Sequence, residues 1–365
     1  MNAAVDHALS AQPPLARRSE TAAARRLVAG WLLACCALVA AMVVLGGVTR
    51  LTGSGLSMVD WKPIHGVVPP LNPAQWQEEF DRYRASPEYR HKNAGMSLAA
   101  FKRIFWFEYS HRLLGRAVGL AFLLPLLWLF ARRLIERRLV PRLLLMFVLG
   151  GAQGVLGWWM VRSGLVDEPR VSQYRLTAHL GLALALYLWM LWTALAVLRG
   201  RDTSTAPARR APLARAALAV LLLAFVTVLS GGFVAGLHAG LVYNTFPSMG
   251  GHWIPPDMWV FSPAWRNLFE NVVTVQFDHR VLASVLFAAV IALWIACWRR
   301  PDAGPARAWA HAAAATVLLQ FTLGIATLLA HVPVPLAALH QANALVVLSA
   351  LTGLAFTLRH PPAPA

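Results

Sequence analysis

The sequence predicts an all-α integral membrane protein with eight transmembrane helices, arranged as two similar four-helix bundles. Three observations lead to this fold class. The chain of 365 residues is 58% hydrophobic and only 13% charged, whereas soluble globular domains are about one quarter charged. Apolar runs of about 20 residues recur along the chain, as bilayer-spanning helices require. The basic residues gather in alternate connecting segments, and the two halves of the chain share sequence motifs.

Each predicted span is an apolar run bounded by polar or charged residues. The spans lie at 27–49, 110–131, 142–161, 175–198, 213–235, 275–298, 308–330 and 337–358. The first run follows several arginines but precedes no small-residue cleavage site. We therefore interpret it as an uncleaved signal-anchor.

The arginines indicate the orientation of the chain in the membrane. They crowd the segments before the first span, between spans two and three, four and five, and six and seven, and after span eight. Cytoplasmic loops carry such an excess, so both termini are predicted to be cytoplasmic. The net charge of +17 is thus explained by topology, and we expect no nucleic-acid partner.

These segments divide the chain into five predicted parts. They are a cytoplasmic N-terminal tail (1–26), a first four-helix half (27–198), a cytoplasmic linker (199–212), a second four-helix half (213–358) and a C-terminal tail (359–365). A long outer loop follows the first span, and its end, MSLAAFKRIFWFEY, predicts an amphipathic helix that leads into the second span. Cys35, Cys36 and Cys297 lie in or beside apolar runs and are expected to be packing residues.

The two halves resemble each other in three places. GGVTRLTGSGLSM from Gly46 aligns without gaps with GGFVAGLHAGLVY from Gly231, HRLLG at 111 matches HRVLA at 279, and LTAHLGLAL around His179 matches AALHQANAL around His340. Four spans per half is an even number. The halves are therefore predicted to be parallel copies about an axis along the membrane normal.

Each half carries one histidine on its second span and one on its fourth: His111 and His179, then His279 and His340. All four spans run inward, so the histidines are expected at one depth near the outer face. Two facing imidazoles can bind a haem iron from both sides, and Arg112 and Arg280 could meet the anionic propionates. The alternative is histidines hydrogen-bonded to neighbouring helices.

Only the first half has a carboxylate on the helical face of its histidine, one turn before it. Glu108 precedes His111 by three residues and shares its helical face, whereas the second half has Gln276 at this place. A carboxylate there could accept a proton or stabilise positive charge at a haem edge. The alternative is an ion pair of Glu108 with Arg112 one turn later.

Together, the GGVTRLTGSGLSM and WKP motifs, EYSHRLLGR, the NTFP motif, DHR and LHQANA resemble the haem A synthase family, in its alphaproteobacterial and mitochondrial form with a long first outer loop. The resemblance covers residues 30–358. It implies a bacterial inner-membrane enzyme that oxidises the C8 methyl group of haem O to a formyl group by successive hydroxylations, with oxygen from water, for cytochrome oxidase biogenesis.

The resemblance also implies roles for the candidate residues. It places a b-type haem on His279 and His340, the substrate haem O on His111 and His179, and a catalytic role on Glu108. A haem O synthase and oxidase assembly factors are the implied partners, and a homo-oligomer stays open. This chain lacks the loop cysteine pair of some bacterial members. The other functions considered are a diheme b-type electron carrier, which would not need Glu108, and a haem transporter. His238 and His331, at outer positions, are candidates for controlling access.

Overall fold

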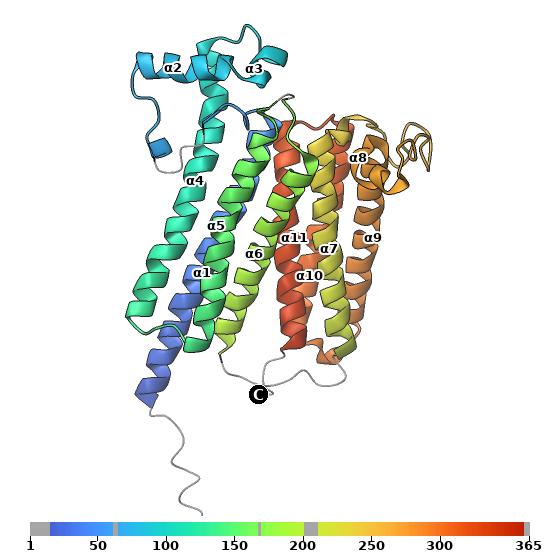
Figure 1. The fold of residues 1–365 in the computed structure, drawn as a ribbon. Coiled ribbons are helices and arrows are strands. Elements are labelled where there is room, and N and C mark those ends of the chain that lie inside the picture. The colour runs from blue at the N-terminus through green and yellow to red at the C-terminus, as the bar shows by residue number, and fades with distance from the viewer. Residues whose placement is uncertain (1–14, 61–64, 167–168, 201–210, 361–365) are drawn as a thin grey trace, which may run out of the picture.

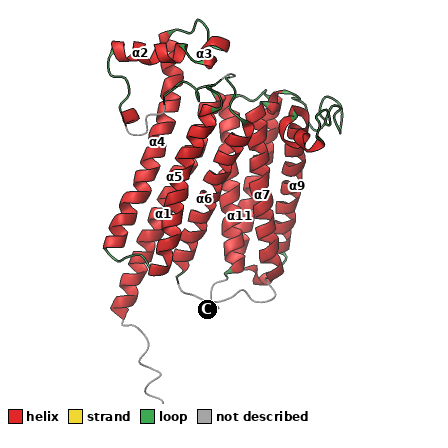
Figure 2. Ribbon diagram, viewed as in Figure 1, coloured by secondary structure: helices red, strands yellow, loops and turns green. Residues whose placement is uncertain are grey.

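The computed structural model describes residues 15–60, 65–166, 169–200 and 211–360. Within these ranges, eight helices are long and apolar enough to cross a membrane, which confirms the predicted number of spans. They stand side by side in one bundle (Figures 1 and 2). They are α1 (Leu15–Leu51), α4 (Leu98–Ala131), α5 (Val140–Arg162), α6 (Gln173–Arg199), α7 (Ala211–Leu237), α9 (Val272–Trp298), α10 (Ala306–Leu329) and α11 (Val334–Arg359).

Two helices extend well beyond the predicted spans. The helix α1 begins at Leu15, inside the predicted tail. The helix α4 begins at Leu98, where the side chain of Ser97 caps it by accepting the Ala100 N–H. The predicted amphipathic segment and second span are therefore one continuous helix. Most of the predicted linker (199–212) and the WKP motif lie outside the described residues.

The eight long helices form two groups of four. In the first half, α1 packs against α4 and α6, and α5 packs against α4 and α6; in the second half, α7, α9, α10 and α11 make the same closed ring. The helices α1 and α6 of the first half face α7 and α11 of the second. We name this contact the seam. The start of α1 and the end of α11 lie at the same end of the bundle (Figure 1), as an even number of spans requires.

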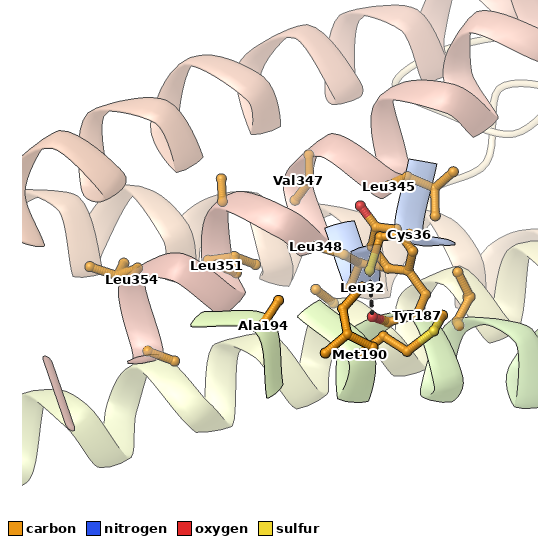
Figure 3. Close-up of a cluster of buried hydrophobic side chains, with 14 of the residues drawn as sticks. Leu32, Cys36, Tyr187, Met190, Ala194, Leu345, Val347, Leu348, Leu351 and Leu354 are labelled. Carbon is orange, nitrogen blue, oxygen red and sulfur yellow. Dashed lines mark hydrogen bonds between the residues drawn. The ribbon is translucent and has the colours of Figure 1, made fainter. Parts of the chain in front are cut away.

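The centre of the seam is packed with apolar side chains from α1, α6 and α11 (Figure 3). Leu32 and Cys36 of α1 meet Tyr187 and Met190 of α6, and the Cys36 thiol points to the Tyr187 carbonyl at 3.7 Å. Since lipid is as apolar as these side chains, close packing rather than exclusion of water holds such helices together. Cys35, Cys36 and Cys297 are free and buried, which confirms the expectation that they are packing residues.

The opposite end of the bundle carries the short helices α2 (Pro73–Arg84), α3 (Pro87–His91) and α8 (Asn267–Glu270), and we name it the cap end (Figure 1). The helices α2 and α3 rest on the first turns of α4. Aromatic side chains spaced along one face of α2 pack there against aromatic side chains of α4. This aromatic cap cluster consists of Trp76, Phe80, Tyr83, Phe101, Phe105 and Tyr109. It anchors the long loop of the first half above the bundle.

Candidate functional site

The four histidines all lie near the cap end of the bundle. His179, His279 and His340 follow the starts of α6, α9 and α11 by about two turns, whereas His111 follows the start of α4 by more than three turns because α4 extends into the cap. His111 and His179 are close enough for their charges to interact, and so are His279 and His340. The structure thus brings together the two predicted pairs, one in each half.

Every histidine ring lies against a glycine of a neighbouring helix. A Cβ built on Gly157, Gly231 or Gly324 would come within 3.0–3.2 Å of Cε1 of His179, His279 or His340, respectively. A Cβ on Gly46 would come within 2.9 Å of Nε2 of His111. Contacts this short are tighter than nearly all real Cβ contacts, so even a methyl group there would press on the ring. Each ring therefore occupies a notch beside a glycine, and the ring orientation at His111 differs from the other three.

The two glycines of each aligned Gly-Gly pair have different neighbours. The first glycine of each pair, Gly46 or Gly231, receives the histidine of its own half. The second glycine faces the other half: a Cβ on Gly47 would overlap the Gln341 side chain, and one on Gly232 would lie 3.0 Å from the Thr177 hydroxyl. The same dipeptide thus seats a histidine and lets the two halves approach.

A further repeated motif, in addition to the three noted in the sequence, lies on α5 and α10. QGVLG at 153–157 and QFTLG at 320–324 share the pattern Q-x-x-L-G and end on the glycines that receive His179 and His340. The amide of Gln153 donates to the His179 carbonyl at 3.0 Å. The amide of Gln320 lies 3.2 Å from Nδ1 of His340. The repeated spacing of glutamine and glycine was the available signal, but it is short and lies on apolar spans without charged residues.

The two candidate arginines hold the loops that follow α1 and α7. Arg112 donates to the carbonyls of Met58 (2.8 Å) and Asp60 (2.9 Å). Arg280 donates to the carbonyls of Tyr243 (2.8 Å) and Thr245 (2.8 Å). In the alignment of Gly46 with Gly231, Met58 matches Tyr243 and Asp60 matches Thr245. The two guanidinium groups therefore make the same contacts in register.

The two halves differ in chemistry at the position of Glu108. Its carboxylate is buried and accepts from the Ser57 hydroxyl at 2.7 Å, the Met58 N–H at 2.8 Å and Arg112 at 2.6 Å. The ion pair with Arg112, considered from the sequence, is thus present. Breaking a buried pair of this kind by removing one partner costs about 3–5 kcal/mol, since a buried charge is left uncompensated.

The counterpart of Glu108 reverses the direction of the hydrogen bond. Gln276 donates its amide to the Tyr243 carbonyl at 3.0 Å, whereas Glu108 accepts from the N–H of the matching residue, Met58. The side-chain oxygen of Gln276, Oε1, has no hydrogen-bond partner within the described part of the chain. The second half thus keeps the frame of the first but carries no charge at this position.

Comparison with known proteins identifies the family of this chain. Residues 29–352 match the family of cytochrome oxidase assembly proteins described as COX15-CtaA. The chain belongs to this family. It is 50% identical over 322 residues to a protein of Parvibaculum lavamentivorans named heme A synthase, covering 88% of this chain and 91% of that protein. It is 51% identical over 320 residues to the heme A synthase of Nitrosospira multiformis, covering 87% and 90% of the two chains.

The donor set of each pair suits a haem better than a bare ion. Among residues that the structure describes, no group of three His, Cys, Asp or Glu side chains could hold a metal. A haem supplies the remaining donors from its own macrocycle, so two histidines suffice. The notches seat the rings, and Nδ1 of His179 and Nε of Arg280 are buried without a hydrogen-bond partner. These residues fit a haem with two histidine ligands in each half.

The two outer candidates, His238 and His331, lie in turns after α7 and α10. Among the other glycines of α4 and α6, Gly119 faces open space, whereas Gly115 and Gly181 lie against Met42 and Leu229. Nε2 of His238 lies 3.3 Å from Arg50, whose guanidinium also reaches across the seam to the Ala235 carbonyl. Burial and the charge of Arg50 lower the pKa of His238. His331 is exposed in the turn after α10, so neither histidine joins a ligand pair.

Proposed function

We propose that this chain is a haem A synthase, a membrane oxidoreductase that converts the C8 methyl group of haem O into a formyl group. Its relatives of about 50% identity carry the name heme A synthase, and the family is one of oxidase assembly. One observation supports the chemistry most directly. Two histidine pairs sit in glycine notches, and among the described residues only the first pair has a buried carboxylate, Glu108, one helical turn from a histidine.

The second half is proposed to hold a resident b-type haem. His279 and His340 would hold its iron, and Nε of Arg280, which has no hydrogen-bond partner among the described residues, would be available to a propionate. When bound, this haem supplies an iron that takes up and releases single electrons. The place of Glu108 is taken there by the uncharged Gln276, which suits a carrier of electrons rather than a site of proton transfer.

The first half is proposed to hold the substrate. His111 and His179 would fix haem O through its iron, so that the methyl group faces Glu108. Each hydroxylation takes an oxygen atom from water and releases two protons, together with two electrons that pass to an external electron acceptor. Loss of water from the twice-hydroxylated carbon leaves the formyl group. Glu108 would accept a proton from the attacking water or stabilise positive charge at the methyl carbon. Arg112 and the Met58 N–H hold the carboxylate in place for this role.

The proposal includes an orientation of the chain in the membrane. Both termini would lie in the cytoplasm of a bacterium, and the cap end, with both histidine pairs, would face the outside of the inner membrane. Haem O is a lipid-soluble molecule because of its farnesyl tail, so entry from the bilayer is proposed. Its supplier would be a haem O synthase, and the product would pass to cytochrome oxidase assembly factors.

The proposal is tested by extracting and separating haems from membranes of a host that makes haem O and an oxidase but lacks its own synthase. The intact chain is expected to yield haem A. Glu108→Gln is expected to lower haem A about 100-fold or more, the scale of a lost general acid or base, and to accumulate haem O or its hydroxylated form.

The matched control is Gln276→Glu, which changes the equivalent position of the second half. It is expected to leave haem A formation within a fewfold of the intact chain. If the intact, haem-loaded chain forms no haem A, the synthase proposal is wrong and the diheme electron carrier takes its place. Equal losses in Glu108→Gln and Gln276→Glu would refute the special role of Glu108.

A further inference from the structure

We infer that Ser230 is a positioning residue for the second histidine pair: its hydroxyl holds the proton of His279 on Nδ1, which leaves Nε2 free to bind iron. This inference rests on the proposed haem b site on His279 and His340. It adds a role for a side chain outside the ligand set. The sequence analysis did not single out Ser230, which lies directly before the double glycine at 231.

The hydrogen bonds of Ser230 determine which atom carries the proton. Its Oγ lies 2.7 Å from the Thr227 carbonyl, to which it donates, and 2.8 Å from Nδ1 of His279. A hydroxyl has a single proton, and a carbonyl can only accept it. The remaining lone pairs of Oγ therefore face Nδ1, so Nδ1 must be the donor in this contact.

Gly231 lets the ring come close to this serine. A Cβ there would lie 3.2 Å from Cε1 and 3.7 Å from Nδ1 of the ring. The notch and the serine thus act together on one nitrogen.

The first half lacks this device. In the alignment of Gly46 with Gly231, the residue that matches Ser230 is Leu45, whose side chain cannot accept a hydrogen bond. His111 also presents Nε2, rather than Cε1, to its glycine. A ligand whose other ring nitrogen donates to an oxygen is oriented and made more basic, and losing such a partner commonly weakens metal binding about 10–100-fold. Ser230 therefore favours retention of a haem in the second half only.

The test compares the full-length chain with Ser230→Ala, Ser230→Thr and Ser284→Ala, each purified with its b haem. The readouts are the rate at which apomyoglobin extracts the b haem and the midpoint potential of that haem in a redox titration. Ser230→Ala is expected to speed extraction about 10-fold or more and to raise the potential, because a less basic imidazole stabilises ferric iron less. Ser230→Thr, which restores a hydroxyl, is expected to return both readouts toward the intact chain.

Ser284→Ala is the control, since the Ser284 hydroxyl donates to the Arg280 carbonyl of its own helix. It is expected to change neither readout. The inference is overturned if Ser230→Ala keeps the extraction rate and potential of the intact chain, or if Ser230→Thr behaves like Ser230→Ala. An intact chain that holds no b haem would instead refute the proposed function on which the inference rests, so the two failures are distinct.

Discussion

The two halves of this protein use one frame for two kinds of site. In both, a histidine lies in a glycine notch, and the arginine that follows it donates hydrogen bonds to matching backbone carbonyls of the preceding loop. Two of the differences between the halves bear on these sites: the first half has Glu108 and Leu45 where the second has Gln276 and Ser230. The first half thus has a buried carboxylate, and the second has a hydrogen bond to Nδ1 of His279.

This difference separates chemistry from retention. A site that must release its product benefits from a reactive group and from a ligand that is not locked. Under the proposed function, a site that keeps its cofactor benefits from an oriented ligand and does not need a buried carboxylate such as Glu108. We infer that the halves are copies of one four-helix unit, because equivalent atoms make equivalent contacts. The predictions that follow use each half as the control for the other.

The largest effect is expected from removing a ligand. His279→Ala leaves a proposed haem b iron with one protein ligand and should lower the b haem content of the purified chain more than about 100-fold, beyond the loss expected for a supporting group. His111→Ala should keep the b haem and abolish haem A formation. The haem content is measured from the absorption spectrum and by extraction. A b haem that is lost from His111→Ala but kept by His279→Ala would reverse the assignment of the halves.

A smaller effect is expected from filling a notch. Gly231→Ala places a Cβ 3.2 Å from the His279 ring, and overpacking of this kind costs about 1–3 kcal/mol. The b haem content should fall severalfold, whereas Gly46→Ala should keep the b haem and reduce haem A formation. Gly30→Ala is the control, because no atom lies within 4 Å of a Cβ there. An unchanged haem content in Gly231→Ala would show that the notch does not seat the ligand.

An effect on local stability alone, with no change in haem content, is expected in the cap, which the long loop of the first half forms. Glu88 is buried beside the Tyr83 hydroxyl at 3.3 Å, and burial raises its pKa from 4.5 to about 7. The folded cap therefore prefers the protonated acid. Its stability should be highest below pH 4.5, fall by about 3 kcal/mol as the pH rises through 7, and then level off.

Hydrogen exchange of α2 and α3 between pH 5 and pH 8, corrected for the intrinsic rate, measures this loss. Glu88→Gln should remove most of the pH dependence. Glu78→Gln changes an exposed carboxylate of the same cap and should leave it intact. The same pH dependence in the intact chain and in Glu88→Gln would assign the effect to another group. The cap belongs to the first half, so the loops of the second half serve as an internal reference.

The sequence by itself determined the spans and the ligand candidates. Apolar runs must become helices in a bilayer because the backbone has no other hydrogen-bond partners there. The eight long apolar helices of the described residues confirm the predicted spans. The four histidines could be chosen because an ionisable group in such a run is costly and needs a reason. The motifs were sufficient to recognise the family. The proposed haem assignments come from that resemblance and from the pairing of the histidines.

Only the tertiary structure decided which residues surround each histidine. In the sequence, Gly157 and Gly324 look like many other glycines of apolar spans. In the structure, a histidine ring from the next helix lies against each of them. Glu108 could have faced lipid, water or Arg112; the loop that brings Ser57 and Met58 to its carboxylate fixed its place. Ser230 gains its role from a ring 49 residues further along the chain. Such contacts depend on how helices pack, and helix packing is set by the sum of many weak contacts that no local pattern records.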